Sequence, residues 1–219
     1  PEPPDEKRSL TLKIVELCES ADAELDAQAD AFDKLRELEK NAPAVLEAAK
    51  TNAAAAATRL SAVQAQLERL EASYSAAALA PVAANPAQAK DLVDFAQQHI
   101  NDADAALASG DSATAAVAVH TAQASLGQVT QLLDAVDGME KTLTETMTAL
   151  GAVIADTEQD LAAARALPET TDARLSQTIA QADAAVTSAK ASKDPLAALA
   201  TLQTVNAQLD TVLESARAH

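Results

Sequence analysis

The sequence is poor in the large side chains that fill a compact enzyme core. It contains no tryptophan, its aromatic residues are Phe32, Tyr74 and Phe95, and glycine occurs 4 times in 219 residues. Hydrophobic residues make up 48% of the chain, but many of them are alanine, which favours helix and lets helices approach closely. We find no convincing run with the period-two alternation of a strand. We therefore expect an all-α protein of thin, closely packed helices.

Basic residues are also scarce. The chain has 16 Lys and Arg against 33 Asp and Glu, which gives a net charge of -17. Nucleic-acid binding needs clustered cations, and an anionic membrane surface would repel this charge. Two interpretations remain open: the charge keeps the chain soluble, or it selects a basic protein partner.

Cysteine and long apolar runs are nearly absent. Cys18 is the only cysteine, so no internal disulfide can form. No stretch approaches the roughly 18 uninterrupted apolar residues of a membrane span, so this chain is not expected to cross a membrane. It starts at Pro1 without methionine. This start suggests a processed or excised fragment from which a targeting signal has been cut away.

What the sequence does contain is an apolar seam at alternating spacings of three and four residues. This pattern predicts a helix of about 48 Å that packs along other helices. The seam consists of Leu46, Ala49, Ala53, Ala56, Leu60, Val63, Leu67, Leu70, Tyr74 and Ala77. A similar seam with one irregular step predicts an earlier helix, from about Asp5 to Glu39. It consists of Leu10, Ile14, Leu17, Ala21, Leu25, Gln28, Phe32 and Leu35.

Proline and glycine positions predict where the helices begin and end. Asn41 as an N-cap and Pro43 in a first turn predict a break between the first two helices, which would form an antiparallel hairpin. The second helix would end before Pro81 and the third would start at Asn85. The remaining predicted features are a turn at Gly110, one long helix to about Leu167 that continues through Asp137 and Gly138, a loop over 168–172, and helices over 173–191 and from Pro195 to the end.

An internal repeat predicts how these helices group. Residues 103–106 recur as 182–185, and the seam that follows recurs with Asn206 at the position of Leu126. We expect elongated antiparallel bundles: two spectrin-like three-helix units, 44–136 and 139–219, that share a long helix, preceded by an N-terminal linker and helix over 1–43. The predicted structural seam residues are Leu46, Leu60, Val63, Leu67, Leu70, Leu126, Val129, Leu133, Leu199, Leu209 and Leu213. A seam of this kind closes equally well within one chain or between two, so a homodimer stays open.

No recognisable catalytic or cofactor motif occurs, so we expect neither an enzyme nor a cofactor. The candidates for a metal site are His99 and His120, which would lie at about the same level of a hairpin that turns at Gly110. Together with Asp94, Asp102 or Asp104 they would suit zinc or copper. The alternative is that both histidines face solvent or make local hydrogen bonds, because no ligand quartet at a known spacing supports the site.

The stretch from Asp91 to Asp137 contains no lysine or arginine. Its charged residues are Asp91, Asp94, Asp102, Asp104, Asp111, Asp134 and Asp137. Most helical surfaces mix both signs, so this hairpin could receive a partner helix or a basic segment. Compositional drift in an alanine-rich protein is the alternative.

Three stretches carry a resemblance to a known family. The runs Leu70–Ala89, Leu126–Val136 and Asp194–Leu199 resemble the helical region of actinobacterial TPM-domain-containing membrane proteins. The resemblance implies that a signal peptide, an extracytoplasmic TPM domain and a transmembrane helix precede this chain. It would then lie at the cytoplasmic face of the membrane, with residues 1–4 near the membrane exit. No residue of the TPM domain is present, so none of its sites is carried over.

The sequence thus favours a non-enzymatic helical scaffold or spacer, the protein-interaction region of a membrane-anchored protein. The alternative is a bundle that senses a ligand or metal through the hairpin 91–137. The partner itself is not identified by the sequence.

Overall fold

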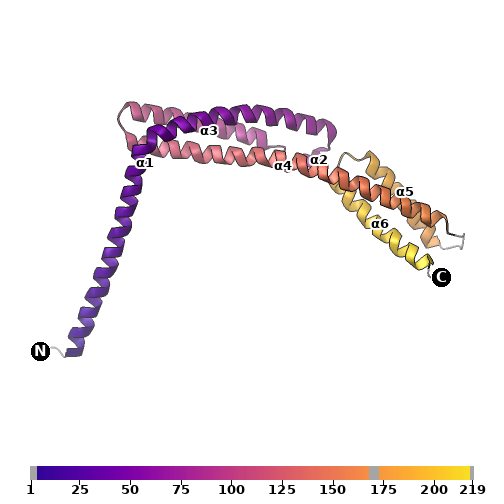
Figure 1. Ribbon diagram of the computed structural model, residues 1–219, viewed down its shortest axis with the longest axis horizontal. Helices are drawn as coiled ribbons and strands as arrows, with labels where there is room; N and C mark the ends of the chain where they lie inside the picture. Colours follow the sequence, from indigo (N-terminus) through magenta and orange to yellow (C-terminus); the bar gives the residue numbers. More distant parts are fainter. Residues whose placement is uncertain (1–3, 168–172, 218–219) are drawn as a thin grey trace. The chain divides into compact units, whose positions relative to one another are not determined.

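The computed structural model describes residues 4–167 and 173–217, and these are helical with no strand. The elements are α1 (Pro4–Ser73), α2 (Ala76–Leu79), α3 (Asn85–Ala108), α4 (Ser112–Arg165), α5 (Ala173–Ala191) and α6 (Pro195–Arg217). Figure 1 shows them in chain order. The predicted all-α class is confirmed. The predicted loop over 168–172 lies outside the described residues.

The predicted break at residues 40–43 is wrong, and with it the hairpin of two N-terminal helices. α1 is one helix of 70 residues with Pro43 inside it. A proline inside a helix removes one backbone hydrogen bond and costs about 3 kcal/mol or more. Ala42 and Leu46 on either side of Pro43 are 2% and 1% exposed, whereas Pro43 itself is exposed. Continuing the helix keeps this apolar face buried, and the proline ring stays on the solvent side.

The end of α1 also differs from the prediction, since the helix stops at Ser73 rather than near Pro81. Ser75 is the reason, because its extended backbone and its hydroxyl form the N-cap of the short helix α2. Its Oγ accepts a hydrogen bond from the backbone nitrogen of Ala78 at 3.2 Å. Serine side chains compete with the helix for backbone groups in this way.

The later boundaries follow the predictions. α3 begins at Asn85, and α4 passes through Asp137 and Gly138 without a break. A glycine inside a helix costs roughly 1 kcal/mol, and the full burial of Val136 and Leu143 on either side offsets it. The turn between α3 and α4 contains Gly110 with φ +82°, a conformation that other residues rarely adopt.

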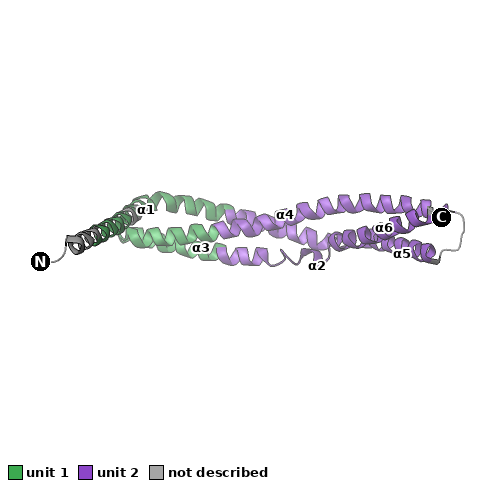
Figure 2. Ribbon diagram, turned by 90° about the horizontal axis from the view of Figure 1, so that it is seen from below, with its two compact units in different colours: residues 1–55, 93–126 green, residues 56–92, 127–219 purple. Residues whose placement is uncertain are grey.

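The chain divides into two compact units, coloured separately in Figure 2. The first consists of residues 1–55 and 93–126, and therefore contains parts of α1, α3 and α4. Its core is built largely from alanine, which allows the helix backbones to approach closely. The fully buried alanines are Ala49, Ala96, Ala103, Ala115 and Ala122, and Leu46, Ile100 and Val119 are buried with them.

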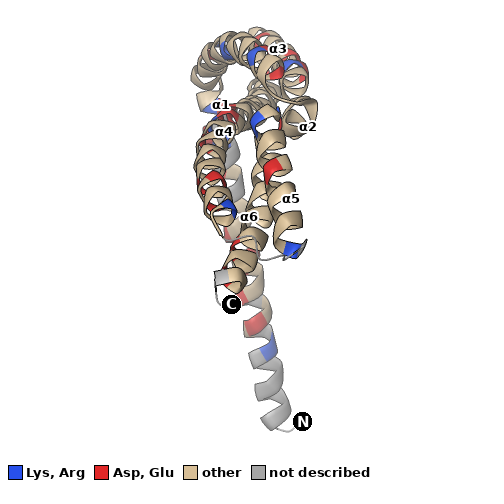
Figure 3. Ribbon diagram, turned by 90° about the vertical axis from the view of Figure 1, so that its right-hand side faces the viewer, with Lys and Arg blue, Asp and Glu red and all other residues tan. Residues whose placement is uncertain are grey.

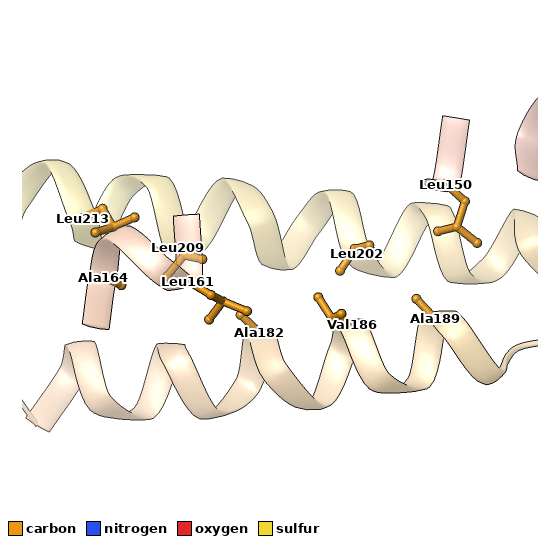
Figure 4. Packing of buried hydrophobic residues seen from close by; sticks show 9 residues of the cluster. All are labelled: Leu150, Leu161, Ala164, Ala182, Val186, Ala189, Leu202, Leu209 and Leu213. Atoms are coloured by element: carbon orange, nitrogen blue, oxygen red, sulfur yellow. The ribbon is translucent and has the colours of Figure 1, made fainter. Parts of the chain in front are cut away.

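The second unit consists of residues 56–92 and 127–219. Its C-terminal part has a cluster of larger side chains to which α4, α5 and α6 all contribute. Figure 4 shows Val186 of α5 and Leu202 of α6 pointing toward one another within this cluster. Both units are discontinuous in sequence, whereas the predicted division into 1–43, 44–136 and 139–219 is continuous, and that division stays a prediction.

Pairs of polar side chains fix helix directions in the second unit. Arg59 of α1 contacts Asp134 and Asp137, and Gln66, further along α1, contacts Glu140, further along α4. These two helices therefore run in the same direction. α4 and α5 run in opposite directions, because Glu158 pairs with Lys190 and Arg165 pairs with Asp183.

Candidate interaction surface

The eleven predicted structural seam residues between Leu46 and Leu213 lie on the inner faces of the helices. All of these except Leu199, which is half-buried, are buried, whereas Leu17, Leu25 and Phe32 of the seam predicted for the earlier helix are exposed. Burial of such side chains contributes roughly 1.5–3 kcal/mol each relative to leaving them exposed. The buried seam residues therefore serve packing, and any surface for a partner has to lie among exposed residues.

The cations missing from residues 91–137 are supplied by α1. In the first unit, Lys50 Nζ lies 2.8 Å from Asp104 Oδ1. In the second unit, Arg59 pairs with Asp134 and also lies 2.7 Å from Asp137 Oδ2. The hydrogen bonds to these carboxylates raise the pKa of Lys50 and of Arg59. In Figure 3, acidic and basic positions occur along the described helices.

Asp111 has a structural role at the start of α4. Its Oδ1 accepts a hydrogen bond from the backbone nitrogen of Thr114 at 3.0 Å, and its Oδ2 accepts one from Thr114 Oγ1 at 2.7 Å. These bonds hold the pKa of the Asp111 carboxyl below its ordinary value of 3.8. This is an N-cap arrangement, in which a side-chain oxygen accepts a hydrogen bond from a backbone nitrogen in the first turn of the helix.

His99 is half-buried on α3, where Phe95 and Asp102 of the same helix lie beside it. The ring of Phe95 meets it edge-on, with centroids 4.4 Å apart and an interplanar angle of 72°. Its Nδ1 lies 3.8 Å from Asp102 Oδ2. Residues four before and three after a given position share its helix face, so this arrangement is local.

His120 is exposed on α4, next to half-buried Thr121 and buried Ala122. Among the described residues, no group of three or more His, Cys, Asp or Glu is arranged to hold a metal ion. The structure therefore adds no third ligand, within its described part, to the hypothesis of a metal site at His99 and His120.

Two large apolar side chains of the first unit are exposed within residues 91–137, the stretch that contains no lysine or arginine. Phe95 on α3 is 45% exposed and Val117 on α4 is 68% exposed. Phe95 also carries the edge-on contact with His99, which holds the aromatic ring at the surface. The ring follows Asp94 in the sequence, and the His99 that it contacts lies near Asp102, so an exposed apolar ring occurs close to carboxylates.

Sequence reasoning missed a polar junction in the second unit. The backbone nitrogen of Ser75 donates to the carbonyl oxygen of Lys193 at 2.8 Å, and Lys193 Nζ donates to the carbonyl oxygen of Ala72 at 3.3 Å. The turn between α5 and α6 is thereby fixed to the end of α1. Backbone groups make most of this junction, so no pattern of side chains announces it.

Asn206 is a buried polar residue on the seam of α6, 9% exposed. Its Nδ2 donates to Asp156 Oδ2 at 3.2 Å, but its Oδ1 has no hydrogen-bond partner. A polar residue on a buried seam can fix helix register. Asn206 is buried in this way.

A shallow pocket of about 190 Å³ lies where α5 and α6 approach their connecting turn. Its lining consists of alanines together with Ser188, Ser192 and Thr201. It contains no charged side chain and no pair of titratable groups, so it offers no acid or base for chemistry.

No helix among the described residues is both long and apolar enough to cross a membrane.

Comparison with known proteins finds mycobacterial relatives. The chain is 34% identical, over 226 aligned positions and 97% of its length, to UPF0603 proteins of Mycobacterium tuberculosis strains CDC 1551 / Oshkosh and H37Rv. No family model and no solved structure matches it. The chain thus has actinobacterial relatives, and it spans about a third (34%) of their length.

Proposed function

We propose that the chain is a non-enzymatic helical scaffold whose first unit binds a basic, partly apolar helix of another protein. The observation that carries the proposal is the exposure of Phe95 and Val117 on a stretch that contributes only negative charges. Long helices with buried seams supply a stiff support, and the exposed apolar residues supply the contact. A docked helix would contact these side chains and place Lys or Arg near Asp102.

Affinity in such a complex would come mainly from the apolar contact. An exposed aromatic side chain that becomes buried is a common anchor of protein interfaces. The carboxylates would act chiefly on association rate and on choice of partner. Association should therefore slow as salt rises, since the Debye length falls from about 10 Å at 0.1 M to about 3 Å at 1 M.

The test uses a designed amphipathic helical peptide with leucines on one face and lysines on the other. Its binding to the chain is measured by fluorescence anisotropy, together with a peptide in which glutamate replaces lysine. We expect the lysine peptide to bind and the glutamate peptide to fail. Phe95→Ser should weaken binding of the lysine peptide at least tenfold, which corresponds to about 1.4 kcal/mol.

Leu196→Ser is the matched control, because Leu196 is an exposed leucine on α6 of the second unit. It should leave binding unchanged. Equal weakening by both substitutions would show nonspecific attraction to a negative protein and would refute the assignment to Phe95.

We further propose that the scaffold belongs to a membrane-anchored protein and lies on the cytoplasmic face. Two observations support this: the chain covers about a third of its mycobacterial relatives, and its sequence resembles the helical region of TPM-domain-containing membrane proteins. The test is protease protection in cells that carry the full-length protein. Antibodies to this region should detect digestion in inside-out vesicles and protection in intact spheroplasts; the opposite pattern would place the region outside the cytoplasm.

A further inference from the structure

The N-terminal part of α1 carries apolar side chains that nothing in the described structure covers. We call residues 13–41 the arm. Every described residue from Lys13 to Ala29 is exposed. Leu17, Leu25 and Phe32 are 64%, 62% and 67% exposed, which makes them among the most exposed large apolar side chains described. Scattered exposed leucines are ordinary, but these are not scattered.

Leu17, Leu25 and Phe32 lie on one narrow stripe of the arm, whereas Val15, which is 47% exposed, lies outside it. At about 100° per residue, Leu17, Ala21, Leu25, Gln28 and Phe32 fall within a sector of about 80°. Glu24 borders this stripe, whereas Glu19, Asp26 and Asp33 lie on the opposite face of the helix. We call the five residues of the sector the arm stripe. A stripe this narrow is typical of a helix that pairs with one other helix.

The arm stripe continues an interface that the first unit already uses. The same face of α1 carries Ala42, Leu46, Ala49 and Ala53, which are all buried in the core of the first unit. Lys50 of α1 pairs with Asp104 of α3. Residue 44 lies six residues before Lys50, and Gly110, six residues after Asp104, lies in the turn that follows α3. The hairpin of α3 and α4 therefore turns back beside Pro43, and the apolar face of α1 runs on beyond the cover that the hairpin provides.

We propose that a second copy of this chain covers the arm stripe, in a parallel two-stranded coiled coil with both arms in register. In this register each stripe residue meets its own counterpart, so Gln28 meets an amide that can both donate to it and accept from it. Glu19, Asp26 and Asp33 then point away from the partner arm. The proposal is independent of the basic partner proposed above, which uses α3 and α4.

The antiparallel arrangement fits the arm less well. Matching Phe32 with Leu17 of an antiparallel copy sets Leu25 opposite Glu24. It also sets Gln28 opposite Ala21, which offers its amide no partner. Both mismatches place a polar group against an apolar side chain, and such burial is unfavourable without a hydrogen bond. The stripe therefore favours the parallel register over this antiparallel one.

The first experiment measures the molar mass of the 219-residue chain by light scattering over a hundredfold concentration range. We expect a dimer at high concentration. Leu25→Asp should raise the dissociation constant at least a hundredfold, because it places a charge in the stripe. Ala27→Asp is the matched control: it adds the same charge on the arm outside the stripe and should leave dimerisation within a few-fold of the wild type.

The second experiment tests direction and register. Leu25→Cys in a Cys18→Ala background should form a disulfide-linked dimer on mild oxidation, because equivalent stripe residues meet in the parallel register. Asp26→Cys in the same background should not, since Asp26 lies on the opposite face.

Three outcomes overturn the proposal. A wild-type chain that stays monomeric throughout leaves the stripe to a different partner. A dimer without the Leu25→Cys cross-link refutes the parallel register. Equal cross-linking at both positions shows random collision. Each variant keeps the packed core intact, so an unchanged melting temperature confirms that it is folded.

Discussion

At the scale of the residue, Asn206 illustrates how one polar side chain can weaken a seam. It is buried among apolar neighbours on α6 and only one end of its amide is hydrogen-bonded. A buried polar atom without a partner costs about 1–3 kcal/mol. Its partner Asp156 is exposed and can turn to water when the amide is removed. The equivalent position of the internal repeat carries Leu126.

Asn206→Leu should therefore stabilise the protein by about 1 kcal/mol, because it removes an unsatisfied group and adds apolar burial. The measurement is the free energy of unfolding in urea, with the slope of the transition as a check on two-state behaviour. Asn206→Asp serves as the comparison and should destabilise, since it sets a second carboxylate beside Asp156. A less stable leucine variant would show that the Asn206 amide makes a stabilising contribution beyond its hydrogen bond to Asp156.

Asp111 gives a pH dependence with a definite sign. Hydrogen bonds from Thr114 lower its folded-state pKa below the ordinary value of 3.8. A carboxyl with a depressed folded pKa stabilises the fold above its unfolded pKa and loses this contribution as pH falls through the folded value. At neutral pH the contribution is complete.

Asp111→Asn should lower the melting temperature at pH 7, and the difference from the wild type should shrink as pH is lowered below about 4. Asparagine keeps a cap oxygen but cannot carry the charge. Thermal unfolding at a series of pH values from 7 to acid measures the difference. A difference that stays constant with pH would show that the charge of Asp111 does not contribute.

At the scale of the element, α1 shows that a local break signal can be overruled. Asn41 with Pro43 and Asn85 with Pro86 present similar signals, but only the second begins a helix. Pro86 lies in the first turn of α3, where its missing N–H has no helical partner in any case. Pro43 lies where the buried face of α1 continues on both sides, so packing outweighs the lost hydrogen bond.

Pro43→Ala should therefore stabilise α1, by up to about 3 kcal/mol, because it restores a helical hydrogen bond at an exposed position. Far-ultraviolet circular dichroism during thermal unfolding measures the gain. Pro86→Ala is the control and should give no gain, since a first-turn proline leaves no bond to restore. Equal gains from both changes would contradict this account of Pro43.

At the scale of the whole molecule, α1, α3 and α4 each pass from one compact unit into the other. Packing in either unit therefore depends on helices that the units share. Leu67 is buried on α1 in the second unit, whereas Ala65, two residues before it, is exposed. Replacing each of them with aspartate separates the effect of burying a charge from the effect of adding one.

Leu67→Asp should destabilise the protein by about 3–5 kcal/mol, because it buries a carboxylate without a partner. Ala65→Asp adds the same charge on the exposed face and should change stability by less than about 0.5 kcal/mol. Urea unfolding followed by circular dichroism compares the two. Similar effects from both variants would show that the seam assignment at Leu67 is wrong.

The sequence by itself determined the all-α class and most helix boundaries. Alanine content, seams at spacings of three and four, and the local chemistry of Asn85, Gly110, Asp111 and Pro195 are short-range signals, and helices depend largely on short-range interactions. The seam position of Asn206 is readable from the sequence because residue spacing is local, whereas its burial depends on distant contacts.

Only the tertiary structure decided the features that depend on distant contacts. Packing on α3 and α4 carries α1 through Pro43, and Arg59 neutralises Asp134 and Asp137 from 75 and 78 residues away. Backbone atoms fix Lys193 to the end of α1. A seam looks the same whether or not another helix covers it. The exposure of Leu17, Leu25 and Phe32, where the cover from α3 and α4 stops, is therefore a property of the fold.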